Sequence, residues 1–262
     1  MQIVILGSGN IASNLLYALN ETSVKVRCLY GRNAVKTEKL ANRYSIPYTN
    51  IITEIPKNAH LYIIAVSDNA IVQVAKSLPD INGMLVHTAG SVAMHNLHPY
   101  AHNYGVCYFL QSFSEEAPTM FQNIPAFIET NLPENLQLLK QFVNTLTPHC
   151  FEYNSVQRLQ LHLASVIACN FTNHFLAIAY KLLNSDIQTY GHLKPLMEHT
   201  LKKAFSNNPL LVQTGPAVRN DTQTLEKHLN ILENDPEIKN LYKFVSDNIV
   251  KLSQTKKNPD EF

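Results

Sequence analysis

Short apolar runs separated by polar turns occupy the first 150 residues. Several runs are apolar throughout and rich in β-branched residues, which is typical of strands buried on both faces of a parallel sheet. Helical spacing of apolar positions between them predicts helices at 34–44 and 70–78. Strands are predicted at 3–6, 24–30, 47–48, 61–66, 84–87, 106–110, 126–129 and 150–153. This alternation of strands and helices predicts an α/β domain with a mostly parallel, doubly wound sheet.

The pattern changes after residue 155. Residues 156–183 contain no Gly or Pro, and their apolar side chains fall all round the helical circumference, which predicts a long helix buried on most sides. Polar residues such as His162, Asn170 and His174 interrupt it too often for a membrane span. Further helices are predicted at 193–205, 222–232 and 235–255. We therefore expect an N-terminal α/β domain over residues 1–153 and an all-α C-terminal domain over 154–262.

Composition narrows the class of protein. Hydrophobic residues make up 45% and charged residues 16% of the 262 positions, as in globular proteins. The net charge of +1 favours neither nucleic acid nor a membrane surface as a partner. The four cysteines are too far apart for a zinc motif or a disulfide framework, so no metal site is expected. The chain begins with a strand and shows no signal peptide, which favours a cytoplasmic location.

A glycine-rich turn follows the first predicted strand. Its residues are Gly7, Ser8, Gly9, Asn10, Ile11 and Ala12, and a helical pattern continues from them. In a strand–turn–helix context, the first glycine makes the tight turn and the second lets a pyrophosphate approach the backbone. The small third residue lets the helix pack on the strand. We expect these six residues to bind a dinucleotide; a glycine-rich turn without a ligand is the alternative.

The end of the second strand bears on the choice of cofactor. An acidic residue there would bind the adenosine ribose of NAD, but none lies between Val24 and Lys36. Arg32 stands in that region, and its guanidinium matches a 2′-phosphate. This favours NADP(H) over NAD(H), with an ordinary surface arginine as the alternative.

Polar residues follow the other strands, at the edge of a parallel sheet where ligands bind. Val66, Ser67 and Asp68 follow the strand at 61–66, and we expect cofactor contacts there; Asp68 could equally cap the next helix. His87 and Thr88 end the strand at 84–87, near the expected nicotinamide. Thr88 is a candidate cofactor contact. His87 is a candidate catalytic residue or a buried structural histidine.

Three candidates for substrate chemistry lie in the second half. His162 and Asn170 are on the long helix, where histidine could deliver a proton to a carbonyl or imine and asparagine could hold the substrate. A polar bridge between helices, or within a dimer interface, is the alternative. Arg219 follows a Gly-Pro turn and could clamp a carboxylate, unless it pairs with Asp221. An apolar helical domain also makes a homodimer plausible.

These motifs together resemble the 6-phosphogluconate dehydrogenase-like superfamily, and within it the oxidoreductases that carry domain of unknown function 2520. The resemblance rests on Gly7-x-Gly9-x-x-Ala12, Val66–Ile71, His87–Gly90, Leu110–Phe113, His162–Asn170 and Gly215-Pro216-x-x-Arg219-x-Asp221. It implies a Rossmann domain with a helical C-terminal domain, binding NADP(H), related to pyrroline-5-carboxylate reductase, ketopantoate reductase and deazaflavin-dependent NADP oxidoreductase. Three departures concern Ser67, where relatives often have proline, Ala89, where they often have serine, and the lysine of the hydroxyacid dehydrogenases, which is not apparent on the long helix.

Two functions follow as hypotheses. One is an NADP(H)-dependent oxidoreductase that reduces a small keto or imino acid and binds this substrate through its carboxylate. The other is a dinucleotide-binding sensor or interaction protein that has lost catalysis, which the three departures favour.

Overall fold

A computed structural model describes residues 1–255. The chain divides into two compact units, Met1–Cys169 and the residues from Asn170 onward. One helical stretch, Ser155–Leu182, runs through the division. The domain boundary expected at 153/154 lies at the start of this stretch.

The first unit is built on an eight-stranded sheet of order β3-β2-β1-β4-β5-β6-β7-β8. All neighbouring strands are parallel except β6 and β7. The strands are β1 (Gln2–Leu6), β2 (Lys25–Tyr30), β3 (Tyr48–Thr49), β4 (Leu61–Ile64), β5 (Met84–His87), β6 (Tyr104–Phe109), β7 (Ala126–Thr130) and β8 (Cys150–Glu152). The expected α/β domain with a mostly parallel, doubly wound sheet is confirmed.

Strand β1 lies where the order of the sheet reverses. It pairs with β2 on one side and β4 on the other, so that Leu6 is level with Tyr30 and with Ile64. In open α/β sheets, ligands bind at the carboxyl ends of the strands beside such a reversal. This topology places the glycine-rich turn after Leu6 at the expected binding edge.

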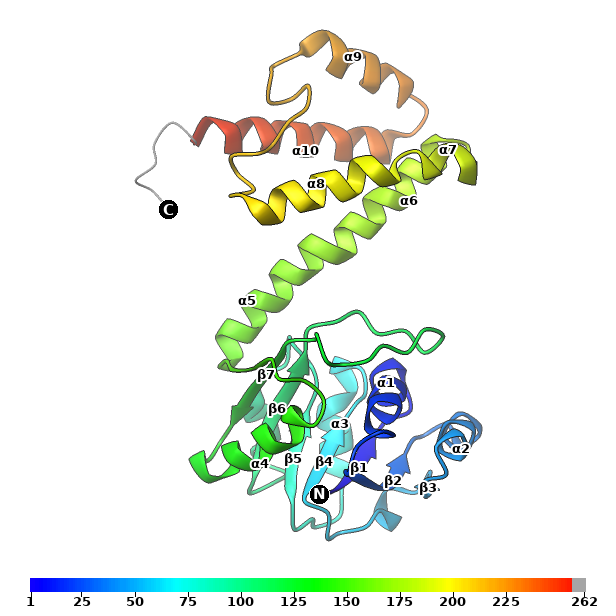
Figure 1. The fold of residues 1–262 in the computed structure, drawn as a ribbon, viewed down its shortest axis with the longest axis vertical. Helices are drawn as coiled ribbons and strands as arrows, with labels where there is room; N and C mark the ends of the chain where they lie inside the picture. Colours follow the sequence, from blue (N-terminus) through cyan, green and yellow to red (C-terminus); the bar gives the residue numbers. More distant parts are fainter. Residues whose placement is uncertain (256–262) are drawn as a thin grey trace. The chain divides into compact units, whose positions relative to one another are not determined.

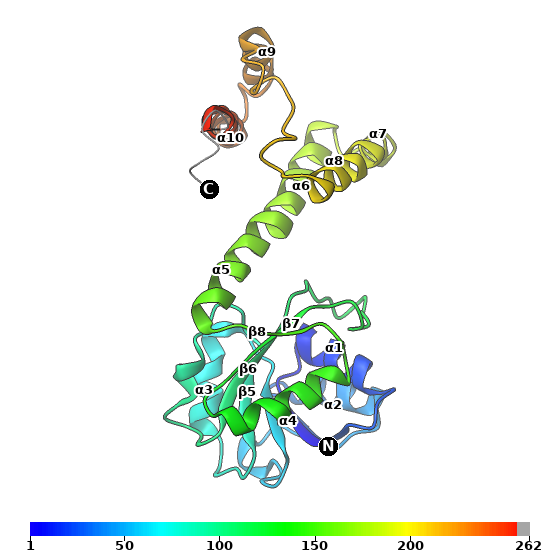
Figure 2. The same ribbon diagram turned by 60° about the vertical axis from the view of Figure 1, so that its left-hand side comes forward.

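Helices cover both faces of the sheet, which explains the apolar strand sequences. On one face Ile3 and Ile5 pack with α1 (Asn10–Leu19), α2 (Ala34–Arg43) and α4 (Pro133–Asn144). On the other, Val4 and Leu6 pack with α3 (Ile71–Ser77). Figures 1 and 2 show this layering within the first unit.

The long helical stretch departs from the prediction in two ways. It consists of α5 (Ser155–Ser165), a π-helical segment (Val166–Phe171) and α6 (Thr172–Leu182), so one regular α-helical period does not run through it. The prediction that it is buried on most sides is wrong for the chain as described, because Arg158 is its one buried residue. Apolar side chains 44–60% exposed line it instead: Leu159, Leu163, Ile167, Phe171, Phe175 and Leu182.

By length and composition alone, Ser155–Leu182 would also suffice to cross a membrane, with a mean hydropathy of 1.3 over its most apolar window.

The second unit is helical throughout its regular structure. After α6 come α7 (Ile187–Gly191), α8 (Lys194–Ser206), α9 (Thr222–Ile231) and α10 (Pro236–Thr255). His228 of α9 hydrogen bonds through Nδ1 to the hydroxyl of Tyr242 of α10 at 2.7 Å, which ties these two helices together. The expected all-helical C-terminal region is confirmed.

Candidate functional site

The turn after β1 has a backbone that only glycine fits at its first position. Gly7 has φ +132°, and a Cβ placed on it would lie 2.2 Å from the carbonyl oxygen of Ala65 after β4. Its N–H donates to the carbonyl of Tyr30 at the end of β2, at 2.7 Å. Gly7 therefore lets the ends of three neighbouring strands meet closely.

Gly9 faces open space. It is the N-cap of α1, no side chain caps this helix, and a Cβ on Gly9 would meet no atom within 4 Å. The first amides of α1 and the positive end of its dipole are thus open to an anion. A pyrophosphate fits this cradle, whereas Ala12, which is fully buried, serves to pack the helix on the sheet.

A cleft of about 420 Å³ extends from this turn. It brings together most residues that the sequence predicts as cofactor contacts. They are Gly7, Ser8, Gly9, Asn10, Ile11, Arg32, Val66 and Ser67, alongside Tyr30, Gly31, Asn33, Ala65, Ala70 and Val74. Their individual contacts with a cofactor stay predictions.

Arg32 lies exposed at one end of this cleft and makes no ion pair among residues 1–255. The next residue, Asn33, caps α2 by accepting the backbone N–H of Lys36 at 3.0 Å. Lys36 in turn pairs with Glu115 at 2.7 Å, so this acidic side chain sits close to the helix start. Lys36, a second cation four residues from Arg32, is not among the predicted cofactor contacts.

The segment after β6 is fastened beside the same turn. Asn10 donates through its side chain to the carbonyl of Phe113 at 3.0 Å, and Asn14 to that of Ser114 at 2.8 Å. Asn14 also accepts the N–H of Thr119 at 2.8 Å. These contacts hold residues 113–119 beside the start of α1.

Asp68 does not cap a helix. The short 3₁₀ turn Asp68–Ala70 has Ser67 as its N-cap, and no side chain bonds to its amides. The Asp68 carboxylate instead accepts a hydrogen bond from the hydroxyl of Ser91. The loop after β4 is thereby joined to the loop after β5.

Thr88 and His87 lie inside the protein. Thr88 is 3% exposed, and its hydroxyl donates to the carbonyl of Ile64 on the neighbouring strand at 3.2 Å. His87 is fully buried, and its Nδ1 accepts the N–H of Ala89 at 3.2 Å. Burial, reinforced by the nearby Arg158 guanidinium, lowers the pKa of His87 to about 3, against a backbone hydrogen bond at Ala93 that raises it. These observations favour the structural alternative for His87, a neutral ring that braces the turn.

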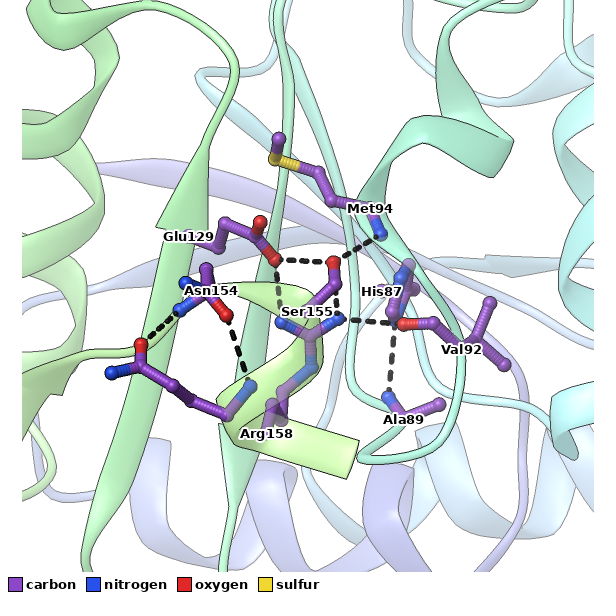
Figure 3. A network of polar contacts seen from close by, with 9 residues as sticks. His87, Ala89, Val92, Met94, Glu129, Asn154, Ser155 and Arg158 are labelled. Carbon is purple, nitrogen blue, oxygen red and sulfur yellow. Dashed lines mark hydrogen bonds and ion pairs between the residues drawn. The ribbon is translucent and has the colours of Figure 1, made fainter. Parts of the chain in front are cut away.

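A buried arginine that the sequence analysis missed lies beside His87 (Figure 3). Arg158 of α5 donates to the Glu129 carboxylate and to the carbonyl of Val92, each at 2.6 Å. Glu129 also accepts the hydroxyl of Ser155 at 2.7 Å. This network fixes the first turn of α5 to strand β7 and to the loop after β5. The sequence does show a lone arginine on an apolar helix and a glutamate at a strand end. It does not indicate that these two side chains form an ion pair.

His162 lies on the same helix as Arg158 and also belongs to the first unit. It follows Arg158 by about one helical turn, and its Nδ1 lies 3.2 Å from the hydroxyl of Tyr108 on β6. A Cβ on Gly90 would lie 2.9 Å from that Nδ1 and 2.8 Å from Cζ of Tyr108. His162 is half-buried, and Tyr108, which the sequence analysis missed, is 8% exposed.

The other two predicted substrate residues belong to the second unit. Asn170 begins that unit and is exposed within the π-helical segment. Because of this segment, the angle about the helix axis between His162 and Asn170 differs from that of a regular α-helix. Arg219 is exposed and forms no ion pair within 4 Å among residues 1–255. Asp221 caps α9 through the N–H of Thr224 at 3.1 Å, and its pKa is lowered by its hydrogen bonds to Thr224 and further by the charge of Arg219. That Asn170 and Arg219 form one substrate site with His162 stays a prediction.

Comparison with known proteins agrees with this architecture. Residues 2–87 match the family described as NADP oxidoreductase coenzyme F420-dependent, and residues 124–249 match domain of unknown function 2520. A Bacteroides fragilis protein assigned as an NADP oxidoreductase has a similar structure, with 34% identity, a TM-score of 0.86, and coverage of 95% of this chain and 98% of that one. A search of curated proteins finds no match.

More distant structures share the fold. A Thermotoga maritima protein is 20% identical with a TM-score of 0.77, covering 96% of this chain and 99% of its own. An imine reductase of Myxococcus stipitatus in complex with NADP⁺ is 12% identical with a TM-score of 0.65, covering 99% and 95%. With its 34% identity to the Bacteroides protein over almost the full length of both, the chain belongs to the NADP oxidoreductase family that joins such a Rossmann domain to domain of unknown function 2520, and is an NADP-dependent oxidoreductase.

Proposed function

We propose that the chain reduces a small keto or imino acid with NADPH. The observation that carries the proposal is the position of His162 within the first unit. Ser67 lines the cofactor cleft, Asp68 after it bonds to Ser91, and the neighbouring Gly90 is in contact with His162. A titratable imidazole thus lies along the same strand-end edge as the glycine cradle.

The residues of the cleft would hold the cofactor. The open amides at Gly9 and the start of α1 would take the pyrophosphate, and Arg32 would take the 2′-phosphate. NADPH, when bound, supplies the hydride. The ends of β4 and β5 are where the nicotinamide of a cofactor anchored in this way is expected.

His162 would supply the proton. Reduction of a carbonyl or imine leaves an oxygen or nitrogen that needs a proton, and a histidine side chain can act as a general acid. His162 Nε2 would donate it, and solvent would restore it. Asn170 and Arg219 would hold the substrate, with the exposed Arg219 guanidinium binding the carboxylate. The shared fold of enzymes named as imine reductases and pyrroline-5-carboxylate reductases supports testing C=N substrates first.

The test has two stages. NADPH binding is measured by calorimetry, and a panel of keto and imino acids is then followed by nicotinamide absorbance. Turnover of a carboxylate substrate supports the proposal. For that substrate, Arg219→Ala should raise KM without changing NADPH affinity, whereas the same substitution of the exposed Arg43 should change neither. Tight NADPH binding without turnover across the panel would favour the sensor function instead.

We also propose a homodimer in the cytoplasm, with a second copy covering the apolar stripe on Ser155–Leu182. The stripe repeats every four residues from Leu159 to Phe175, and exposed apolar side chains that recur in this way along one helix favour an interaction site. Polar residues such as His162 and His174 disfavour a lipid environment for the same helix. Light scattering should show a dimer, and Leu163→Asp a monomer, with Gln160→Asp on the same helix as control. A wild-type monomer, or sedimentation with lipid vesicles, would contradict this assignment.

A further inference from the structure

We propose that Tyr108 is a positioning residue for His162. Its hydroxyl oxygen accepts a hydrogen bond from Nδ1–H of the imidazole and so keeps the exchanging proton on Nε2. The inference rests on the proposed function, in which His162 donates that proton, but the hydrogen bond can be tested without any substrate.

The two side chains come from elements far apart in sequence and meet at one point. Tyr108 projects from β6 and His162 from α5, with the hydroxyl 3.2 Å from Nδ1. Their rings pack edge to face, with centroids 5.9 Å apart and an interplanar angle of 77°. A bond in this geometry fixes both the position and the rotation of the imidazole.

Gly90 makes the approach possible. A Cβ there would come within 3.0 Å of both rings, 2.8 Å from Cζ of Tyr108 and 2.9 Å from Nδ1 of His162. Any side chain at this position would push the rings apart. The backbone of the loop after β5 therefore lies directly against the pair, and this loop leaves the strand beside which the nicotinamide is expected.

The direction of the hydrogen bond follows from the protonation states of the two side chains. Burial raises the pKa of Tyr108, so its hydroxyl keeps its proton at neutral pH. In the imidazolium that would donate the proton, both ring nitrogens carry hydrogen and neither can accept a hydrogen bond. The Tyr108 oxygen is therefore the acceptor, and Nδ1–H of His162 is the donor.

This arrangement suits a proton donor. In the imidazolium, Nδ1–H is held by Tyr108 and Nε2–H is free to leave. Transfer breaks the Nε2–H bond, forms a bond from that proton to the oxygen or nitrogen of the reduced substrate, and leaves a neutral ring with its proton on Nδ1. The same ring then takes a proton from solvent at Nε2. Without the tyrosine oxygen, the neutral ring could carry its proton on either nitrogen.

The test compares Tyr108→Phe with Tyr104→Phe. Tyr104 lies on the same strand and is equally buried, but it has no contact with His162 in the structure. Long-range proton–nitrogen NMR spectra of the full-length protein at alkaline pH report which ring nitrogen is protonated, and His162→Gln assigns the signal. We expect His162 to be mainly the Nδ1–H tautomer in the wild type and in Tyr104→Phe. In Tyr108→Phe the Nδ1–H fraction should fall about twofold or more.

Kinetics provide the second measurement. With a substrate found in the panel, Tyr108→Phe should lower kcat about tenfold or more while the KM for NADPH stays the same, because part of the proton-donor contribution is lost. A wild-type Nε2–H tautomer, or an unchanged tautomer in Tyr108→Phe, would overturn the inference. The expected tautomer shift in a protein without turnover would contradict the proposed function and leave the hydrogen bond supported.

Discussion

The neutral state of His87 should make the stability of the protein fall as the pH is lowered from 6.5 toward 3. The pKa of His87 is about 3 in the folded protein and 6.5 for an ordinary histidine. Between these pH values the unfolded chain binds a proton that the folded chain does not. The stabilisation that the neutral ring contributes is therefore fully present above pH 6.5 and decreases as the pH falls. The slope approaches ~1.4 kcal/mol per pH unit, which gives a loss of about 2 kcal/mol at pH 5 and a limit of about 5 kcal/mol near pH 3.

Other groups also titrate in this range, so the measurement is a difference between variants. His87→Asn keeps an acceptor for the N–H of Ala89 but cannot take up the proton. Urea denaturation of the full chain, followed by circular dichroism at several pH values, should give a weaker pH dependence for His87→Asn than for the wild type. The difference should reach about 2 kcal/mol at pH 5. The same substitution at the exposed His149 should leave the wild-type slope. Equal slopes for wild type and His87→Asn would refute the argument, as would an NMR titration of His87 near its ordinary pKa.

Four further substitutions separate the roles of the cofactor turn and of the buried arginine. Arg32→Ala should weaken NADPH roughly ten- to a hundredfold, with NADH nearly unchanged, because hydrogen bonds to charged groups are worth about 1.5–3 kcal/mol; equal losses in calorimetry would exclude a 2′-phosphate contact. Gly7→Ala should destabilise the fold because of its positive φ and its contact with backbone. Gly9→Ala should keep the wild-type urea midpoint and lose NADPH affinity, since its methyl group enters open space; retained affinity would argue against the cradle. Arg158→Met should cost about 3–5 kcal/mol in urea denaturation by leaving a buried ion pair broken, and a loss no larger than that of the exposed Arg43→Met would contradict this.

The fold could be predicted where burial restricts short stretches of sequence to apolar residues. Strands packed on both faces are apolar throughout, and a run such as residues 61–64 allows little else. The direction of a strand does not affect its residue types in this way. Strand β7 is antiparallel to β6, yet its apolar residues resemble those of the parallel strands. Helix α4, which covers one face beside β7, was likewise not predicted.

Periodicity misled most in residues 155–182. Apolar residues all round a helix indicate that something covers it, but not whether the cover belongs to the same chain. The π-helical segment at 166–171 also changes the angular relation of residues before and after it, which regular spacing cannot reveal.

The candidate site likewise contains residues that could be predicted from the sequence and residues that could not. The glycine cradle could be predicted because its geometry is local and imposes a residue type on the backbone. Tyr108 and Arg158 could not, because their partners are distant in sequence: 54 residues separate Tyr108 from His162, and 29 separate Arg158 from Glu129. Only the folded sheet brings these pairs together.

These long-range pairs fix the position of His162 although it lies on a largely exposed helix. The capping box at Asn154 defines the start of α5, and the Arg158 network fixes its first turn to β7 and to the loop after β5. His162 comes one turn later, and Tyr108 and Gly90 hold its ring from β6 and from the same loop. Every one of these contacts lies within residues 1–169, the unit that also contains the cofactor cleft. The position of His162, the proposed proton donor, relative to the glycine-rich turn is therefore set by the first unit alone, whereas Asn170 and Arg219, the residues proposed to bind the substrate, belong to the second.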